Sequence, residues 1–200
     1  MPPTVVTLQG IRQVVLVTQV AVVGVAVEDG RLLWEFPWSG GRSGGIMPIP
    51  YGDKLIVSAA TAGVVALRPR YRNGSWLVEK AWETSAVEMY ISHPVLIGDT
   101  LFGFSRRASG QLFALDARDG RVLWLGEPRF ATNVAFAKAG DLLFILKDDA
   151  ELIIARANPS GFEPLKTYEV ADSATWAQPV VSGRRLFVKD VSSLTLWTFD

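Results

Sequence analysis

Short apolar runs alternate with polar turns along the whole chain, and the same order of runs and turns repeats five times. In each repeat a hairpin glycine separates a first apolar run from a second, and the five glycines are spaced by 42, 46, 42 and 43 residues: Gly10, Gly52, Gly98, Gly140 and Gly183. Runs of about four to seven residues rich in β-branched and aromatic types, bounded by Gly, Asp and Ser, predict strands. No stretch keeps a helical period over about eleven residues, so we predict no helix longer than a turn.

Each repeat predicts four antiparallel strands, because a third alternating run and a fourth run follow the hairpin. The fourth runs cover residues 31–36, 76–84, 121–125 and 163–169, and the last repeat has three runs. A repeat of about 40–45 residues with four strands is typical of one blade of a β-propeller. We therefore predict an all-β fold, a β-propeller of four-stranded antiparallel blades with about five blades present. The predicted single domain covers residues 1–200, with blades at about 1–38, 44–84, 90–126, 131–170 and 176–200.

One turn carries a spaced motif of the form Ala-x-Asp-x-x-x-Gly-x-x-x-Trp. The motif is formed by Ala114, Asp116, Gly120 and Trp124, and a partial copy keeps Gly30 and Trp34 but has Ala26 in place of the inner Asp. This motif resembles the tryptophan-docking motif of the pyrroloquinoline-quinone (PQQ) repeat propellers, the quinoprotein-like superfamily, and the repeat pattern is similar to outer-membrane protein assembly propeller lipoproteins. In such propellers the tryptophan packs on the neighbouring blade and buries a large apolar area there.

The other copies of the motif are degenerate. The second repeat keeps Ala66 and Trp82 around an insertion, and the fourth keeps Ala155 and Gly161 with Leu165 where the tryptophan would stand. The resemblance implies a bacterial protein of the periplasm or cell envelope, although no signal peptide is visible at the start of the sequence. Members of this family usually close with seven or eight blades. We therefore expect an incomplete ring, the carboxy-terminal portion of a longer propeller.

Composition excludes several classes of partner. The sequence has 20 Lys and Arg against 20 Asp and Glu, and this neutral balance argues against a nucleic-acid partner. No apolar run approaches about 18 residues, so we predict no membrane span. The sequence has no cysteine, which excludes disulfides and thiolate zinc sites.

Candidate ligand positions lie just before the inner strand of each repeat, where a propeller has the mouth of its central channel. These positions are Pro2, Met47, His93, Asn133 and Gln178. In one interpretation His93, Asn133 and Gln178 converge on a ligand, and Met47 is a further candidate position. In the alternative they cap strand ends and bond to water or backbone. His93 is the only histidine, so any histidine-dependent chemistry would have to use it.

Two functions are compatible with these patterns. The first is a non-catalytic scaffold that mediates protein–protein interaction, as the assembly propellers of this repeat type do. The alternative is a quinoprotein-type (PQQ-dependent) dehydrogenase or a diverged relative, which usually has a vicinal cysteine pair over the cofactor and a calcium site of Glu, Asn and Asp. The cysteine pair is absent, and we recognise no such ligand set. We thus expect no catalytic residue, no metal site and no cofactor, neither PQQ nor calcium.

The expected partner is another protein or the missing propeller blades. Five blades at the spacing of a larger ring would leave apolar faces at both end blades and an unpaired edge along residues 194–199. Unpaired edges and contiguous apolar patches favour association with other chains. The sequence therefore also predicts self-association of the isolated chain.

Overall fold

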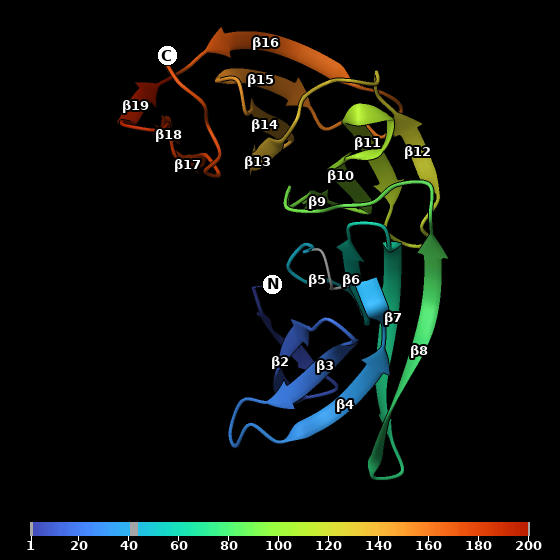
Figure 1. Cartoon of the computed structure of the whole chain (residues 1–200). Coiled ribbons are helices and arrows are strands. Elements are labelled where there is room, and N and C mark those ends of the chain that lie inside the picture. The colour runs from blue at the N-terminus through green and yellow to red at the C-terminus, as the bar shows by residue number, and fades with distance from the viewer. Residues whose placement is uncertain (1, 41–43, 200) are drawn as a thin grey trace. The chain divides into compact units, whose positions relative to one another are not determined.

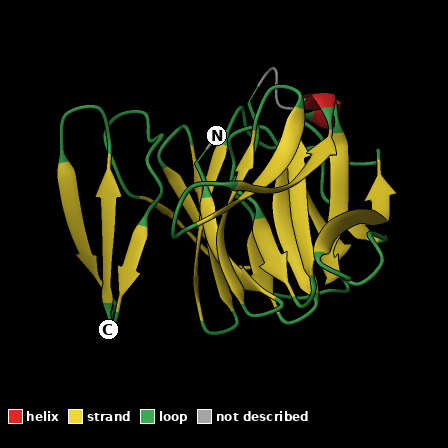
Figure 2. Ribbon diagram, turned by 90° about the horizontal axis from the view of Figure 1, so that it is seen from below, coloured by secondary structure: helices red, strands yellow, loops and turns green. Residues whose placement is uncertain are grey.

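A computed structural model describes residues 2–40 and 44–199, and strands make up nearly all of its regular structure (Figures 1 and 2). Residues 1, 41–43 and 200, which include both ends of the predicted domain, lie outside the described residues. The described residues form nineteen strands in five antiparallel sheets, and a short 3-10 turn spans Arg107–Ser109. The predicted all-β class and the number of blades are confirmed. We number the sheets blades 1 to 5 in chain order.

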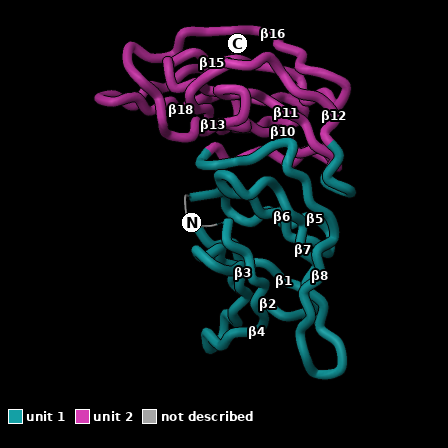
Figure 3. The backbone as a smooth tube through the Cα atoms, turned by 45° about the vertical axis from the view of Figure 1, so that its right-hand side comes forward, with its two compact units in different colours: residues 1–91, 117–121 teal, residues 92–116, 122–200 magenta. Residues whose placement is uncertain are grey.

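The chain divides into two compact units, each described by itself (Figure 3). Unit 1 holds residues 1–91 and 117–121, and unit 2 holds residues 92–116 and 122–200. Unit 1 contains blade 1, with β1 (Thr4–Leu8), β2 (Ile11–Val17), β3 (Ala21–Ala26) and β4 (Leu32–Pro37), and blade 2, with β5 (Ile49–Tyr51), β6 (Lys54–Ala59), β7 (Gly63–Arg72) and β8 (Ser75–Thr84).

Unit 2 contains the other three blades. Blade 3 has β9 (Val95–Ile97), β10 (Thr100–Ser105), β11 (Gln111–Asp116) and β12 (Val122–Leu125). Blade 4 has β13 (Val134–Ala139), β14 (Leu142–Lys147), β15 (Glu151–Arg156) and β16 (Glu163–Glu169). Blade 5 has three strands, β17 (Val180–Ser182), β18 (Arg185–Lys189) and β19 (Leu194–Thr198). Within each sheet, hydrogen-bonded neighbours follow chain order, as short hairpin connections require.

The apolar cores lie between successive sheets within each unit. One core joins blades 1 and 2, a second joins blades 3 and 4, and a third joins blades 4 and 5. Alternate residues of one strand therefore serve two different cores, because side chains of a strand point to opposite faces of the sheet. On β14, for example, Leu143 and Ile145 belong to the core with blade 3, and Phe144 and Leu146 to the core with blade 5.

The insertion in the second repeat lengthens one hairpin. Strands β7 and β8 have ten residues each, and their outer part packs Trp76 and Val78 against the core of blades 1 and 2. On β7, Arg68 Nε lies 2.9 Å from Asp53 Oδ2. This arginine therefore forms an ion pair with a carboxylate of the same blade.

A β-bulge recurs between the third and fourth strands of blades 1 to 4. The register shifts after Gly24, Ala66, Ala114 and Ile154 in the four sheets. A bulge leaves one residue of the fourth strand without a partner on the third strand. The next residue of the fourth strand then pairs with the third-strand residue named above. Trp34, Trp82, Trp124 and Lys166 therefore occupy equivalent positions. The repeat spacing predicts Leu165 at the tryptophan position of blade 4. This prediction is wrong by one residue, because Leu165 is the unpaired residue of the bulge and Lys166 takes the tryptophan position.

Candidate functional site

The predicted channel-face residues make hydrogen bonds between blades within unit 2. Asn133, which precedes β13, accepts a hydrogen bond from Ser92 Oγ at 2.7 Å, and Ser92 lies shortly before β9. Gln178, which precedes β17, donates from Nε2 to the carbonyl oxygen of Phe136 on β13 at 2.7 Å. These amides link the inner ends of neighbouring sheets. This is what we expect if they cap strand ends and do not bind a ligand. Their role toward a ligand stays a prediction.

His93 and Met47 behave differently from the two amides. Burial lowers the pKa of His93 below its usual value, and its buried Nδ1 has no hydrogen-bond partner among the described residues. Met47 is half-buried and belongs to unit 1, so its place relative to the three residues of unit 2 is not described.

The docking tryptophan of blade 1 is deeply buried. Trp34 is 4% exposed, belongs to the core shared with blade 2, and donates its indole N–H to Gln13 Oε1 at 2.5 Å. Its ring lies against Gly24, where any Cβ would come within 2.3 Å of the indole. A glycine is therefore needed where the motif elsewhere has alanine. The turn at Gly30 has a positive φ, which glycine adopts without strain.

The next two tryptophans use backbone acceptors in the loop that follows the third strand of the next repeat. Trp82 donates to the carbonyl oxygen of Ala117 at 3.1 Å and packs against Gly120, where a Cβ would lie 2.4 Å from the indole ring. Trp124 donates to the carbonyl oxygen of Asn158 at 3.0 Å. Its ring stands between the rings of Phe102 and Phe162, each with a centroid 6.3 Å away. The motif residues Ala114 and Asp116 are both buried on β11.

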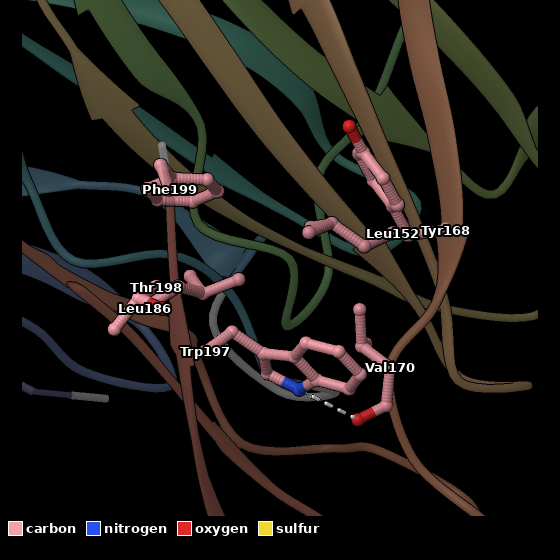
Figure 4. A pocket seen from close by; sticks show the side chains of 7 residues that line it. All are labelled: Leu152, Tyr168, Val170, Leu186, Trp197, Thr198 and Phe199. Carbon is pink, nitrogen blue, oxygen red and sulfur yellow. Dashed lines mark hydrogen bonds between the residues drawn. The ribbon is translucent and has the colours of Figure 1, made fainter. Parts of the chain in front are cut away.

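The contact between blades 4 and 5 reverses this direction. Lys166 is exposed at the docking position, so blade 4 presents no indole to blade 5. Instead Trp197 on β19 reaches back to blade 4 and donates its indole N–H to the carbonyl oxygen of Val170 at 3.1 Å (Figure 4). Phe199 packs on Phe144 with ring centroids 5.6 Å apart, near the place that Trp124 takes beside Phe102 in blade 3.

A pocket remains open at this contact. It has a volume of about 460 Å³ and is lined mostly by apolar side chains from β15, β16, β18 and β19: Leu152, Tyr168, Val170, Leu186, Trp197, Thr198 and Phe199. We call it the β16–β19 pocket (Figure 4). Two of its aromatic side chains, Tyr168 and Trp197, are 47% and 42% exposed. Sequence reasoning missed this pocket, because its wall combines residues from two repeats that the sequence alone does not bring together.

The outer face of blade 5 carries exposed leucines. Leu194 is 68% exposed, whereas the equivalent residues Leu112 and Leu152 on the third strands of blades 3 and 4 are at most 2% exposed. Leu196, on the same face, is 50% exposed. On blade 1, Val5 is exposed, and Val14 is half-buried where its equivalent in blade 2, Leu55, is fully buried. Apolar faces of this kind mark interaction surfaces on soluble proteins.

The described residues provide neither a metal centre nor a membrane-spanning helix. In residues 2–40 and 44–199, no three histidine or carboxylate side chains gather closely enough to hold a metal ion. The same residues include no helix with the length and apolar character needed to cross a membrane.

Comparisons with known proteins give a family and a fold. A family model described as outer membrane protein assembly factor BamB matches residues 18–158. A comparison with curated proteins gave no match. Among solved structures, BamB from Moraxella catarrhalis is similar with a TM-score of 0.63 and 16% sequence identity, covering 93% of this chain and 55% of that one.

A second solved structure is the β-propeller domain of Swd1 from Myceliophteria thermophila. It has a TM-score of 0.64 and 11% identity, and the similarity covers 93% of this chain and 66% of that domain. At these identities the two structures bear on the fold alone, and they confirm the predicted β-propeller. The chain spans little more than half the length of the bacterial structure.

Proposed function

The chain belongs to the family described as outer membrane protein assembly factor BamB, and from this premise we propose that it is a non-catalytic β-propeller scaffold that binds protein in the cell envelope. The observation that carries the proposal is the outer face of blade 5. There Leu194 and Leu196 are exposed at positions where blades 3 and 4 are covered by a neighbouring sheet.

The occupant of this face would be another sheet with an apolar surface. An exposed leucine face gains free energy when it is covered, at about 25 cal/mol per Å² of apolar area. Further blades of a longer propeller, a partner protein or a second copy would each supply such a surface. The matched length of about half of the Moraxella catarrhalis protein supports the first of these.

The experiment compares substitutions on the outer face of β19 with a substitution on β16. A doubly substituted chain, Leu194→Asp with Leu196→Asp, would be expressed with an affinity tag and purified from a cell-envelope extract. We expect the unsubstituted chain to retain a protein partner in constant ratio and the doubly substituted chain to lose it. A matched control, Thr167→Asp at an exposed position of β16 in blade 4, should retain the partner. Equal retention by all three chains would contradict the proposal.

We also propose that the protein works without PQQ or calcium. This proposal is supported by the lack of a cysteine pair in the sequence. The test is reconstitution with PQQ and calcium, followed by a dye-linked alcohol oxidation assay. We expect no turnover above that of free PQQ. Turnover that disappears when a chelator is added would overturn the scaffold function in favour of a quinoprotein dehydrogenase.

A further inference from the structure

We infer that a polar pocket at the turns of blades 3 and 4, together with the exposed indole of Trp176, binds a saccharide of two or more linked pyranose rings. This function is additional to the proposed protein binding and uses different residues. The pocket belongs to unit 2 and is formed by blades 3 and 4, which both have all four strands. We call it the turn pocket.

The turn pocket lies where three loops meet at the same end of the two sheets. It has a volume of about 460 Å³ and is lined by Ser109 of the β10–β11 turn, residues 129–132 of the connection from β12 to β13, and residues 147–149 at the β14–β15 turn. Phe130 and Ala131 are the apolar residues of this lining, so polar side chains form most of the wall. A volume of this size suits a small-molecule ligand.

The backbone of one wall is held in an uncommon conformation. Ala108, Ser109 and Arg129 all have positive φ, although none of them is glycine. The two segments are joined by a hydrogen bond from the backbone N–H of Arg129 to the carbonyl oxygen of Ala108, at 3.1 Å. Such conformations persist only where the surrounding structure imposes them, and they are concentrated at functional sites. This wall is therefore fixed by its own hydrogen bonds.

The charged groups of the turn pocket are of both signs. Asp148 Oδ1 accepts the backbone N–H groups of Thr132 and Asn133, at 3.2 and 3.0 Å, and these bonds fix the direction of the carboxylate. Lys147 is neutralised by Asp149, whose Oδ2 lies 3.0 Å from the lysine Nζ. The pocket thus has an oriented carboxylate at a turn that is itself firmly held.

Two groups of opposite charge remain for a ligand. The side chain of Arg129 is exposed and forms no ion pair with any residue that the structure describes. Asp148 Oδ2 accepts no hydrogen bond from the described residues. An anionic ligand would gain from the arginine but would be repelled by the carboxylate, and a cationic ligand would meet the opposite difficulty. A neutral ligand with hydrogen-bond donors and acceptors of its own satisfies both groups.

Sugars meet this requirement. Each sugar hydroxyl both donates and accepts hydrogen bonds, so one ring can accept from the planar guanidinium of Arg129 and donate to the carboxylate of Asp148. The hydroxyl groups of Ser109 and Thr132, both on exposed residues, add further partners along the wall. The polar lining thus favours a polyhydroxylated ligand over an apolar one.

An exposed tryptophan extends the site. Thr175 donates its backbone N–H to the carbonyl oxygen of Asp148 at 3.2 Å and its hydroxyl to the carbonyl oxygen of Lys147 at 2.6 Å, so the connection from blade 4 to blade 5 rests on one side of the turn pocket. Trp176 follows directly and is 58% exposed. The face of a pyranose ring carries C–H groups, which pack on the electron-rich face of an indole. Linked rings would therefore fill the pocket and cover this indole.

The experiment titrates the purified 200-residue chain with three disaccharides, namely N,N′-diacetylchitobiose, cellobiose and maltose, in an isothermal calorimeter. We expect saturable binding of at least one of them with a Kd on the order of 1 mM. Sorbitol, a polyol without a ring face, should bind at least about tenfold more weakly than that disaccharide. The lack of saturable heat from all three disaccharides up to about 20 mM would overturn the inference.

Substitutions in the protein test the two parts of the site. Trp176→Ala should weaken binding of the disaccharide about tenfold, whereas Tyr168→Ala, at an exposed aromatic residue of β16, should change the Kd by less than about twofold. Asp148→Asn keeps an oxygen for the N–H groups of Thr132 and Asn133 but removes the charge, and it should weaken binding about fivefold. Circular dichroism would verify that the three variants keep the sheet structure. Equal Kd values for all four chains would show that the sugar binds elsewhere, and the inference would be wrong.

Two further arms identify the source of the ligand. Co-sedimentation with insoluble chitin, cellulose or starch that the soluble disaccharide competes away would assign a polysaccharide, and disaccharide binding without sedimentation would assign a free oligosaccharide; both results support the inference. The tripeptide Glu-Gly-Lys carries both charges without a sugar ring. If it binds more tightly than every disaccharide, the pocket takes a polypeptide and the inference is overturned. The proposed protein binding through Leu194 and Leu196 uses other residues and would stand in either case.

Discussion

The two contacts of blade 4 are built differently, although both join sheets of the same repeat. Toward blade 3, eleven buried residues form the core, and Trp124 closes its outer end with a hydrogen bond to Asn158. Toward blade 5, six buried residues form the core, Lys166 stands at the docking position, and a pocket remains open. The contact that has a docking tryptophan is closed at its outer end, whereas the contact that lacks one has a smaller core and an open pocket.

Removal of Trp124 should have the largest effect on this comparison. Trp124→Ala deletes a half-buried indole that packs beside Phe102 and Phe162, and it leaves the carbonyl of Asn158 without its donor. We expect the free energy of unfolding of unit 2 to fall by about 3–5 kcal/mol. Urea titration followed by circular dichroism measures it. A loss below about 1 kcal/mol would mean that the tryptophan does not hold the two blades together.

Removal of Trp197 should cost less. Trp197→Ala deletes a half-exposed side chain and one hydrogen bond to Val170, so we expect a loss of about 1–2 kcal/mol in the same titration. The difference between the two variants is the measurement that matters. Equal losses of stability would show that the contact between blades 4 and 5 is as strong as the contact between blades 3 and 4. The distinction between the two contacts would then be wrong.

A tryptophan at the docking position of blade 4 should make its contact with blade 5 more like its contact with blade 3. Lys166→Trp places an indole on the face of β16 that Ile154 shares, where blades 1 to 3 have theirs. We expect about 1 kcal/mol of added stability, as cavity-filling substitutions commonly give. Lys166→Ala is the matched control, because it removes the charge without adding a ring. An unchanged urea midpoint for Lys166→Trp would indicate that Phe199 already fills the docking space.

The smallest expected effect concerns pH at the inner end of blade 3. Burial lowers the pKa of His93 below 6.5, so the unfolded chain binds a proton on this residue more readily than the folded chain. The neutral imidazole thus supports full stability above about pH 6.5, and stability is lost as the pH falls below that value. We expect His93→Gln to lose less stability between pH 7.5 and 5.5 than the unsubstituted chain. Parallel pH dependence in the two chains would show that His93 is solvated.

Periodicity predicts the fold of this chain well, because the hairpin glycines and apolar runs report local backbone geometry. Gly10, Gly52, Gly98, Gly140 and Gly183 all have positive φ at the turns where the sequence placed them. The docking position of blade 4 was displaced by one residue, because a bulge changes pairing without changing composition. Leu165 and Lys166 can be told apart only by the register with Ile154.

The interaction site could not be predicted by counting residues. Trp197 lies in the third run of the last repeat, and its indole N–H could equally have faced forward or back. Its direction is set by its hydrogen bond to the carbonyl oxygen of Val170 on the preceding repeat, which is a property of two repeats together. The side-chain amides of Asn133 and Gln178 were equally unpredictable in their contacts. Each bonds to a residue of the preceding repeat, Asn133 to Ser92 and Gln178 to Phe136.

The five hairpin turns also offer equivalent places to open or label the chain. At each turn glycine a side-chain carbon would meet nothing within 4 Å, so the turns are free of neighbours as well as conformationally demanding. Short insertions at such exposed tips are tolerated, because they disturb no packed surface. Dye pairs inserted at Gly98 and Gly140, or at Gly140 and Gly183, would report the separation of adjacent blades as a spectroscopic distance. Opening of one joint without the other would then be visible in single molecules under denaturant.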